Sequence, residues 1–184
     1  MKKMILTVVT LLPILVSCSS SSNDTYFIHA VSFSENDGLY TVNAVCEKLS
    51  GEENEYFTVS QSGKSVELAT KALMENNKDC YFATCKLYII GNDCSKDFIP
   101  HLAHSLCDSN IYSTKASIIC TDRNNLISFL KSSESFKEID KITEKEKVNA
   151  VRFFSRYTSG KKTKLTCITA TADGVIKQAK DRIF

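Results

Sequence analysis

Two histidines and a cysteine stand three residues apart in the middle of the chain, at His101, His104 and Cys107. Imidazole and thiolate groups are common zinc ligands, so a helix with this spacing is a possible metal site. Steps of three residues leave His101 and His104 on one helical face and carry Cys107 about 120° round from His101, toward the apolar side. Because a zinc site needs at least three placed ligands, we predict no metal here and interpret the histidines as the solvent edge of an amphipathic helix.

A cysteine nucleophile is the second chemical possibility. A catalytic thiol must be partly exposed, have a lowered pKa and lie within hydrogen-bond reach of a base. Cys80 and Cys85 precede an apolar run in a predicted loop and are the only candidates; a small disulfide between them is the alternative. Cys46, Cys107 and Cys120 have apolar neighbours, where a free cysteine behaves as a small buried hydrophobe. No local motif supports catalysis, and no catalytic residue is predicted.

A phosphate-binding loop is the third possibility, because Gly63-Lys64-Ser65 has the form of the end of a Walker A motif. The first glycine of that motif is missing, since Thr58 or Val59 stands in its place. The segment before Gly63 is also not expected to be a buried strand. The sequence therefore predicts no cofactor site.

The beginning of the chain carries the best-supported chemistry. Lys2 and Lys3 precede the apolar run Met4–Val16, which fits the core of a signal peptide. The run is shorter than the roughly 20 residues that a membrane-spanning helix needs. It ends in Leu15-Val16-Ser17-Cys18, which looks like a bacterial lipobox, the signal in which the cysteine thiol takes a diacylglyceryl group and the chain is cut just before it.

Three predictions follow from this pattern for the first 25 residues. Residues 1–17 are a lipoprotein signal peptide, Cys18 is the lipidation site, and residues 18–25 are a polar tether. Cleavage removes Lys2 and Lys3 from the 23 basic residues, so the mature chain carries 21 basic and 21 acidic residues. A balanced charge lacks the basic stripe typical of nucleic-acid binding, so no nucleic acid is expected as a partner.

The apolar pattern predicts an α/β fold, in which a mixed β-sheet begins with an N-terminal hairpin and is flanked by helices. Asp37-Gly38 between two apolar strands predicts the hairpin turn. The continuous apolar run at 86–90 predicts a strand covered on both faces. The predicted strands are 26–33, 39–46, 86–90, 114–121, 164–171 and the segment from 175 onward, and the predicted helices are 65–76, 95–107, 124–130 and 143–157.

Two segments are expected to lack regular structure. Glu47–Gly63 is polar and is interpreted as an exposed loop, and Ser132–Ile142 is interpreted as a linker. Thr143-Glu144-Lys145-Glu146 has the form of a capping box, in which the threonine hydroxyl and the glutamate carboxylate satisfy unpaired backbone N–H groups. It is predicted to open the helix that ends near Tyr157.

The order of these features resembles the C-subunit lipoproteins of bacterial spore germination receptors, the GerC-like family. The features that carry the resemblance are the lipobox cysteine with its polar tether, the hairpin around Asp37-Gly38, the helix opened by Gly63-Lys64-Ser65, the stretch Tyr81–Gly91 with its lysine and aliphatic run, and the tail Ile168–Val175 with Asp173-Gly174. In this resemblance residues 26–158 form the N-terminal α/β domain, and residues 159–184 form a hairpin that begins a truncated second domain.

The resemblance implies a non-enzymatic subunit of a nutrient germinant receptor in spore germination. Such a protein is anchored by its diacylglyceryl lipid to the outer face of the bacterial cell membrane, here the spore inner membrane. Its partners are multi-spanning receptor subunits, and together they sense small germinants such as amino acids. The alternative is a cell-surface lipoprotein with a binding or scaffolding role outside germination, and an exposed Cys–His pair would instead favour an exported enzyme.

Overall fold

The computed structural model describes residues 26–50, 53–77, 80–95, 97–108, 111–123, 126–144 and 148–184. The predicted signal peptide at 1–17, the lipidation site Cys18 and the tether at 18–25 lie outside the described residues. Within the described part of the chain, every helix falls short of the length and apolarity needed to cross a bilayer.

The strands of the described residues are β1 (Tyr26–Asn36), β2 (Leu39–Ser50), β3 (Glu53–Gly63), β4 (Cys80–Tyr81), β5 (Leu87–Ile90), β6 (Ser117–Thr121), β7 (Lys164–Leu165), β8 (Cys167–Ala170), β9 (Ile176–Gln178) and β10 (Arg182–Ile183). One mixed sheet runs in the order β3-β2-β1-β5-β6-β8-β9, with β4 beside the start of β1. β1, β2 and β3 are antiparallel, β5, β6 and β8 run parallel to β1, and β9 is antiparallel to β8. This confirms the predicted α/β fold with a mixed sheet and an N-terminal hairpin.

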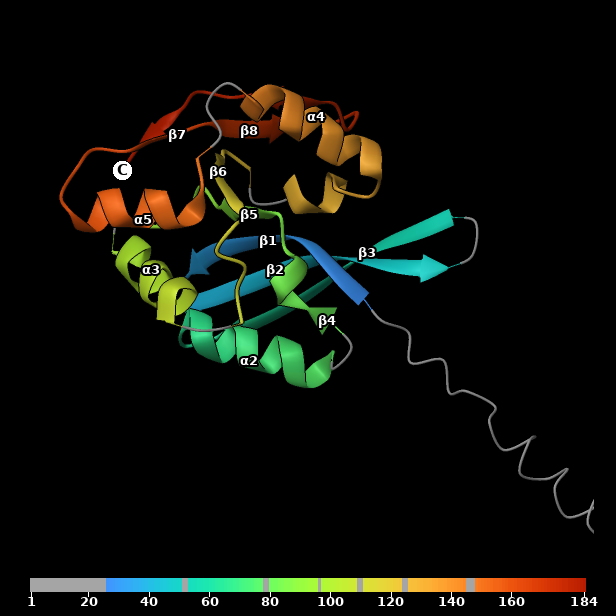
Figure 1. Ribbon diagram of the computed structural model, residues 1–184, viewed down its shortest axis with the longest axis horizontal. Helices are drawn as coiled ribbons and strands as arrows, with labels where there is room; N and C mark the ends of the chain where they lie inside the picture. The colour runs from blue at the N-terminus through green and yellow to red at the C-terminus, as the bar shows by residue number, and fades with distance from the viewer. Residues whose placement is uncertain are drawn as a thin grey trace, which may run out of the picture.

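Helices cover the sheet on both faces, and Figure 1 shows α2 and α4 on opposite sides of the strands. One face, called here the closed face, packs against α2 (Val66–Asn76), α3 (Phe98–Asp108) and α5 (Ala150–Thr158). The other, called the open face, packs against α4 (Ser133–Thr143) and the 3₁₀ helix η2 (Leu126–Phe129). Every residue of β5 and β6 is buried, as the continuous apolar run at 86–90 predicts for a strand between two layers.

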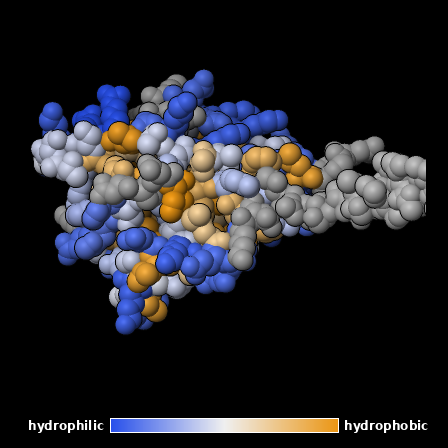
Figure 2. All heavy atoms as spheres, turned by 60° about the horizontal axis from the view of Figure 1, so that its bottom comes forward, coloured by the Kyte–Doolittle hydropathy of each residue, from blue (hydrophilic) through white to orange (hydrophobic). Residues whose placement is uncertain are grey.

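Aromatic rings fill the closed face beneath α2. The ring of Tyr112 contacts Phe33, Phe82 and Tyr88, with centroids 5.3–6.2 Å apart. Its hydroxyl shares a hydrogen bond with the Thr70 hydroxyl, which satisfies both polar groups inside an apolar layer. Outside this layer, Figure 2 shows apolar side chains in separate patches among hydrophilic ones.

Two sequence signals position the first half of the sheet. Asp37 and Gly38 adopt φ values of 49° and 74°, the left-handed conformation that a tight hairpin turn requires. At Gly63, an added Cβ would lie 2.7 Å from the backbone nitrogen of Ala69, so only glycine permits α2 to start this close to β3. Ser65 then caps α2 by accepting a hydrogen bond from Leu68 N at 3.1 Å. The Gly-Lys-Ser sequence thus opens a helix.

The predicted loop at Glu47–Gly63 is wrong. Its first residues extend β2, and the rest form β3, which pairs with β2 along its whole length. β3 is an edge strand: Phe57 and Val59 pack toward the core, while Thr58 and Ser60 face solvent. The polar face and the charged residues at its start hid the alternation typical of a strand.

The predicted linker at Ser132–Ile142 is also wrong, because it forms α4. Ser132 caps this helix by accepting from Ser135 N at 3.3 Å, and Ile139 is its buried apolar residue. Thr143 ends α4 instead of opening the next helix: its hydroxyl donates to the Ile139 carbonyl. The helix that follows, α5, begins after Asn149, whose side-chain oxygen accepts from Val151 N and Arg152 N. Of the predicted capping box, Lys145 and Glu146 lie outside the described residues.

Two strands of residues 159–184 belong to the central sheet. β8 lies parallel to β6 and β9 pairs with β8, so the predicted C-terminal hairpin packs as the edge of this sheet. β7 and β10 form a small separate ladder, and Phe184 packs edge-on against Phe153 of α5, with centroids 5.7 Å apart. These contacts join the tail to the closed face.

Candidate functional site

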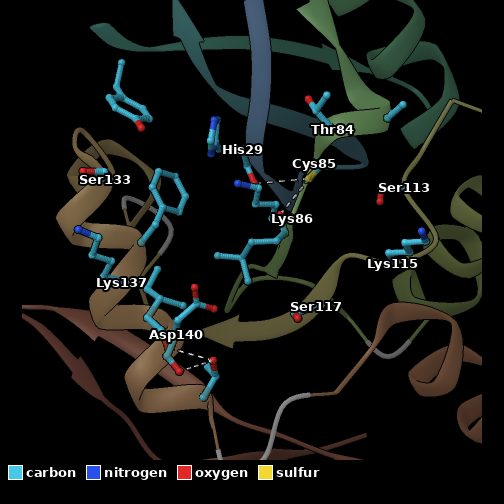
Figure 3. A pocket seen from close by; sticks show the side chains of 16 residues that line it. His29, Thr84, Cys85, Lys86, Ser113, Lys115, Ser117, Ser133, Lys137 and Asp140 are labelled. Carbon is cyan, nitrogen blue, oxygen red and sulfur yellow. Dashed lines mark hydrogen bonds between the residues drawn. The ribbon is translucent and has the colours of Figure 1, made fainter. Parts of the chain in front are cut away.

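The open face contains a cavity of about 490 Å³ between α4 and the first residues of β5 and β6. A volume of this size suits a small organic ligand. In Figure 3, His29 and Lys86 lie on one side, Lys137 and Asp140 of α4 lie across from them, and Lys115 lies on a third side. The apolar part of the wall consists of Leu87, Phe136 and Ile139 together with Ala83.

A β-bulge brings His29 to this cavity. The pairing of β1 with β2 shifts register between Ile28 and Ala30, so His29 is an extra residue with no partner across the ladder. Bulges redirect side chains in this way. The Nε2 atom of His29 then lies 2.5 Å from the carboxylate Oε2 of Glu47. Because Nε2 is used by Glu47, Nδ1 is the ring nitrogen that remains for a ligand.

Glu47 is the centre of a buried polar network. Tyr56 and Asn54 each donate to its Oε1 at 2.8 Å, while His29 meets the other oxygen. Burial alone would raise the pKa of this carboxyl, since its side chain is 11% exposed, but the hydrogen bonds from Tyr56, His29 and Asn54 outweigh burial and lower the pKa. Glu47 is therefore a carboxylate at neutral pH. Burial and the hydrogen bond to Glu47 raise the pKa of Tyr56 to about 12.

Aromatic rings hold His29 in place from two sides. Its ring centroid lies 5.7 Å from that of Tyr56 and 5.5 Å from that of Phe136 of α4. Tyr56 comes from β3 and Phe136 from α4, which are the two elements that sequence reasoning assigned to loop and linker. The site is thus assembled at the meeting point of the bulged strand, the edge strand and α4.

Positive charge predominates at the cavity wall. Lys86, Lys115 and Lys137 line it, whereas Asp140 is the acidic residue that does so. All three lysines are exposed, and no described carboxylate forms an ion pair with them. Lys86 and Ser117 are joined through the backbone, because Ser117 N donates to the Lys86 carbonyl at 2.9 Å. The wall of the cavity therefore contains both lysine ammonium groups and serine hydroxyls.

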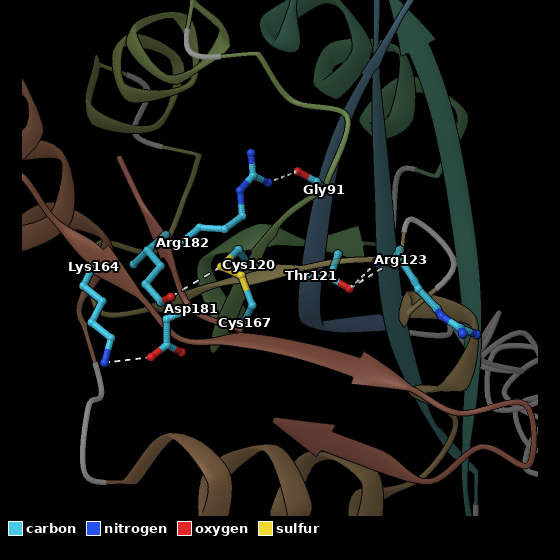
Figure 4. The surroundings of a disulfide bond; sticks show 9 residues. Gly91, Cys120, Thr121, Arg123, Lys164, Cys167, Asp181 and Arg182 are labelled. Carbon is cyan, nitrogen blue, oxygen red and sulfur yellow. Dashed lines mark hydrogen bonds and ion pairs between the residues drawn. A yellow bond between two sulfur atoms is a disulfide. The ribbon is translucent and has the colours of Figure 1, made fainter. Parts of the chain in front are cut away.

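The cavity lies at the amino ends of the parallel strands. In open α/β sheets, ligands usually bind beyond the carboxyl ends, where strand order reverses. Here the carboxyl end of β5 is covered: Arg182 donates from Nη1 to the Gly91 carbonyl at 3.1 Å, and Cys94 Sγ lies 3.3 Å from the Phe33 carbonyl oxygen (Figure 4 shows the arginine contact). The binding space of this sheet is therefore at its opposite end.

The two cysteines that were considered as nucleophile candidates are both buried. Burial raises the pKa of the Cys85 thiol to about 12, and its Sγ lies 3.3 Å from the Leu87 carbonyl oxygen. Such a thiol is not a thiolate at neutral pH. Cys80 meets Cys46 of β2, with 3.5 Å between the sulfur atoms, and neither Cys80 nor Cys85 is in a disulfide. The alternative of a Cys80–Cys85 disulfide is therefore contradicted.

The disulfide of the structure joins Cys120 of β6 to Cys167 of β8. Figure 4 shows it beside the ion pair of Lys164 with Asp181, whose charged atoms are 2.7 Å apart. Cys120 was predicted as a free core thiol; it is buried but oxidised. Strand order explains the pair, because β6 and β8 become neighbours only when the chain returns after α5.

The residues His101, His104 and Cys107 separate in α3. His101 lies 6.5 Å from the ring of Tyr40, while His104 and Cys107 line a groove of about 600 Å³ between α3 and α5. Cys107 is exposed instead of facing the core as predicted, because it lies in the last turn, beside the groove. Among the described residues, no three potential metal ligands come together.

Comparison of the chain with known protein families, with curated proteins and with solved structures finds no match.

The His29–Glu47 pair is the part of the site that sequence reasoning missed. A signal for it exists, because the buried residues Ile28, Val31 and Phe33 are spaced by three and then by two. A strand alternates strictly by two, so the extra residue marks a bulge. The cavity as a whole combines fixed polar groups with an apolar wall. This arrangement is typical of ligand binding.

Proposed function

We propose that this protein is a non-enzymatic lipoprotein, anchored through Cys18 to the outer face of the bacterial cell membrane, and that it serves as a subunit of a nutrient germinant receptor in the spore inner membrane. Its partners in this proposal are the membrane and multi-spanning receptor subunits. The observation that carries the anchor is the sequence Leu15-Val16-Ser17-Cys18 after an apolar run, followed by a polar tether.

A binding role fits the rest of the chain better than catalysis. The thiols that were considered as nucleophiles, Cys80 and Cys85, lie in the core, and the pKa of Cys85 is raised to about 12 by burial. The polar groups around the cavity are held by one another, as Glu47 is by His29 and Tyr56. Groups held in this way offer a preformed surface to a ligand.

A second candidate is favoured by the cavity itself. A surface lipoprotein that binds a small molecule outside germination needs a preformed pocket of several hundred Å³, and the space between α4 and β5 has this size. The two candidates share the anchor and differ in the partner.

The test compares the native protein with a Cys18→Ala variant. Intact mass and membrane fractionation measure the lipid, and affinity purification from spore membranes identifies the partners. We expect the native protein to gain the mass of a diacylglyceryl group, to sediment with membranes and to bring down a multi-spanning subunit, and the variant to lose all three.

Two other outcomes separate the parts of the proposal. A lipidated protein that is absent from spores and brings down no multi-spanning subunit supports the second candidate and removes the germination role. A native protein without added lipid mass contradicts the anchor itself. A Cys107→Ser variant is the matched control. Because Cys107 is exposed and lies far along the chain from Cys18, this variant is expected to keep its lipid.

A further inference from the structure

The cavity of the open face has a definite chemical bias, which goes beyond the proposed function and does not depend on the lipid anchor. Three lysines and one aspartate line it. A ligand with a negative head group therefore gains from the wall charge, and a cation does not. Lys86 and Lys115 precede β5 and β6, which are neighbours in the sheet, so their backbones are fixed by the strands that follow.

One hydroxyl reinforces this bias at the start of β6, and His29 borders the same space. Nε2 of His29 donates to the Glu47 carboxylate, so Nδ1 of the neutral ring is a hydrogen-bond acceptor. The ring is held between Tyr56 and Phe136, and the bulge keeps it at the cavity wall. Ser117 borders the cavity at the start of β6, and its backbone N–H is already used by the Lys86 carbonyl. An anion in the cavity therefore finds lysine ammonium groups and the Ser117 hydroxyl among the groups that line the wall.

Apolar side chains form another part of the wall. Phe136 and Ile139 of α4 and Leu87 of β5 line the same space, and they suit a hydrocarbon or aromatic body. A bare inorganic anion would leave this wall uncovered, and a neutral apolar molecule would leave the lysines without a partner. Lysines and an apolar wall together therefore favour a molecule that has both a negative head group and an apolar body.

We infer that the cavity between α4 and the amino ends of β5 and β6 binds a small organic acid, with its carboxylate at Lys86 and Lys115 and its apolar body against Phe136 and Ile139. Binding is reversible, and no bond is made or broken. Lys137 and Asp140 of α4 line the same cavity (Figure 3).

The experiment uses the full-length protein in a non-ionic detergent and isothermal titration calorimetry. The probes are 3-phenylpropionate, its neutral isostere 3-phenylpropanamide, and inorganic phosphate. We expect the carboxylate to bind about tenfold or more tightly than the amide, because the neutral amide has no negative charge to pair with an ammonium group. Phosphate, which has no apolar body, is expected to bind more weakly than 3-phenylpropionate.

Two double variants locate the binding. Lys86→Gln with Lys115→Gln is expected to lower the affinity for 3-phenylpropionate about tenfold or more, toward that of the amide. Lys161→Gln with Lys162→Gln removes the same number of exposed charges outside the cavity and is expected to leave the affinity unchanged. Circular dichroism melting curves check that both variants fold.

Three results would overturn the inference: equal affinity for acid and amide, no heat with either probe, or the same loss in both double variants. Failure here is distinguishable from failure of the proposed function. A lipidated protein that brings down a multi-spanning subunit but does not bind the acid retains its receptor role, and an acid-binding protein without lipid retains its cavity.

Discussion

The two faces of the central sheet are packed with different side chains. On the closed face, aromatic residues such as Phe33, Tyr88 and Phe153 lie fully buried beneath α2, α3 and α5. On the open face the buried residues are aliphatic, among them Ile89, Ile119 and Ile168, and fewer helical residues cover them. The closed face has its polar groups paired inside the layer, whereas the open face retains a cavity with charged walls.

This difference separates stability from binding. A close-packed aromatic layer with three helices supplies most of the buried apolar surface, so it can hold the sheet while the other face remains open. Substitutions of residues on the open face are then expected to lower the free energy of unfolding less than substitutions on the closed face. The predictions below test this division, from the largest expected effect on the free energy of unfolding to the smallest.

Removal of the disulfide on the closed face has the largest expected effect. Cys120→Ser with Cys167→Ser opens a link across 47 residues, and the loop-closure entropy gained by the unfolded chain lowers the free energy of unfolding by about 4 kcal/mol. Urea denaturation of the full-length protein measures the loss. Cys107→Ser is the control and is expected to change the free energy of unfolding by less than about 0.5 kcal/mol. Unchanged stability of the wild type in reductant would contradict a bonded pair.

Cavity-creating substitutions compare the two faces directly. Leu102→Ala, in α3 on the closed face, is expected to cost about 3 kcal/mol, because this side chain is completely buried. Phe136→Ala, in α4 on the open face, removes a side chain that is larger than leucine but only half-buried beside the cavity. We expect it to lower the free energy of unfolding by about 1 kcal/mol. Chemical denaturation of both variants measures the two losses in free energy of unfolding. A Phe136→Ala loss equal to or above that of Leu102→Ala would remove the distinction between the faces.

The polar network beside the cavity is expected to contribute less than the closed face. Glu47→Gln replaces a charged acceptor of three hydrogen bonds by a neutral amide, and a loss of about 2 kcal/mol at pH 7 is expected. The pKa of Glu47 is lowered by folding, so its contribution is fully present above the ordinary carboxyl pKa and disappears as pH falls through the folded value. Denaturation at pH 7 and again in acid should therefore show the difference between wild type and variant narrowing in acid. A difference that widens in acid would refute the charged state of Glu47.

The smallest effect on stability is expected from the residues that matter most for binding. Lys86→Gln with Lys115→Gln should change the free energy of unfolding by no more than about 0.5 kcal/mol, because both side chains are exposed. The same variant loses affinity for 3-phenylpropionate in the calorimetric test. If it instead unfolds as readily as the disulfide variant, the lysines hold the fold and the division between faces is wrong.

The parts of the fold that the sequence predicted are those with strong local signals. Asp37-Gly38 between two apolar strands allowed only a hairpin, and the uninterrupted run that became β5 predicted burial on both sides. β3 and α4 were missed for one physical reason. Each is a surface element with a single apolar stripe, and solvent-facing polar residues outnumber those in the stripe, as Phe136 and Ile139 show in α4.

The candidate site was harder to predict, because it depends on contacts between distant segments. His29 and Glu47 are 18 residues apart and meet only through the bulged pairing of β1 with β2. Cys120 and Cys167 are separated by 47 residues and become neighbours only through the order of the parallel strands. Pairings of this kind follow from topology, and cysteine spacing alone leaves them undetermined.

The central position of β1 has a mechanical consequence if Cys18 carries the lipid as proposed. β1 is the first strand of the described residues and lies inside the sheet, with β2 on one side and β4 and β5 on the other. A pull from the membrane would act along its length. The ladder hydrogen bonds of an antiparallel pair lie across the strand. They would therefore be loaded together in shear instead of being broken one after another. An anchor attached to β1 would thus transmit force into the interior of the sheet and not to an edge strand.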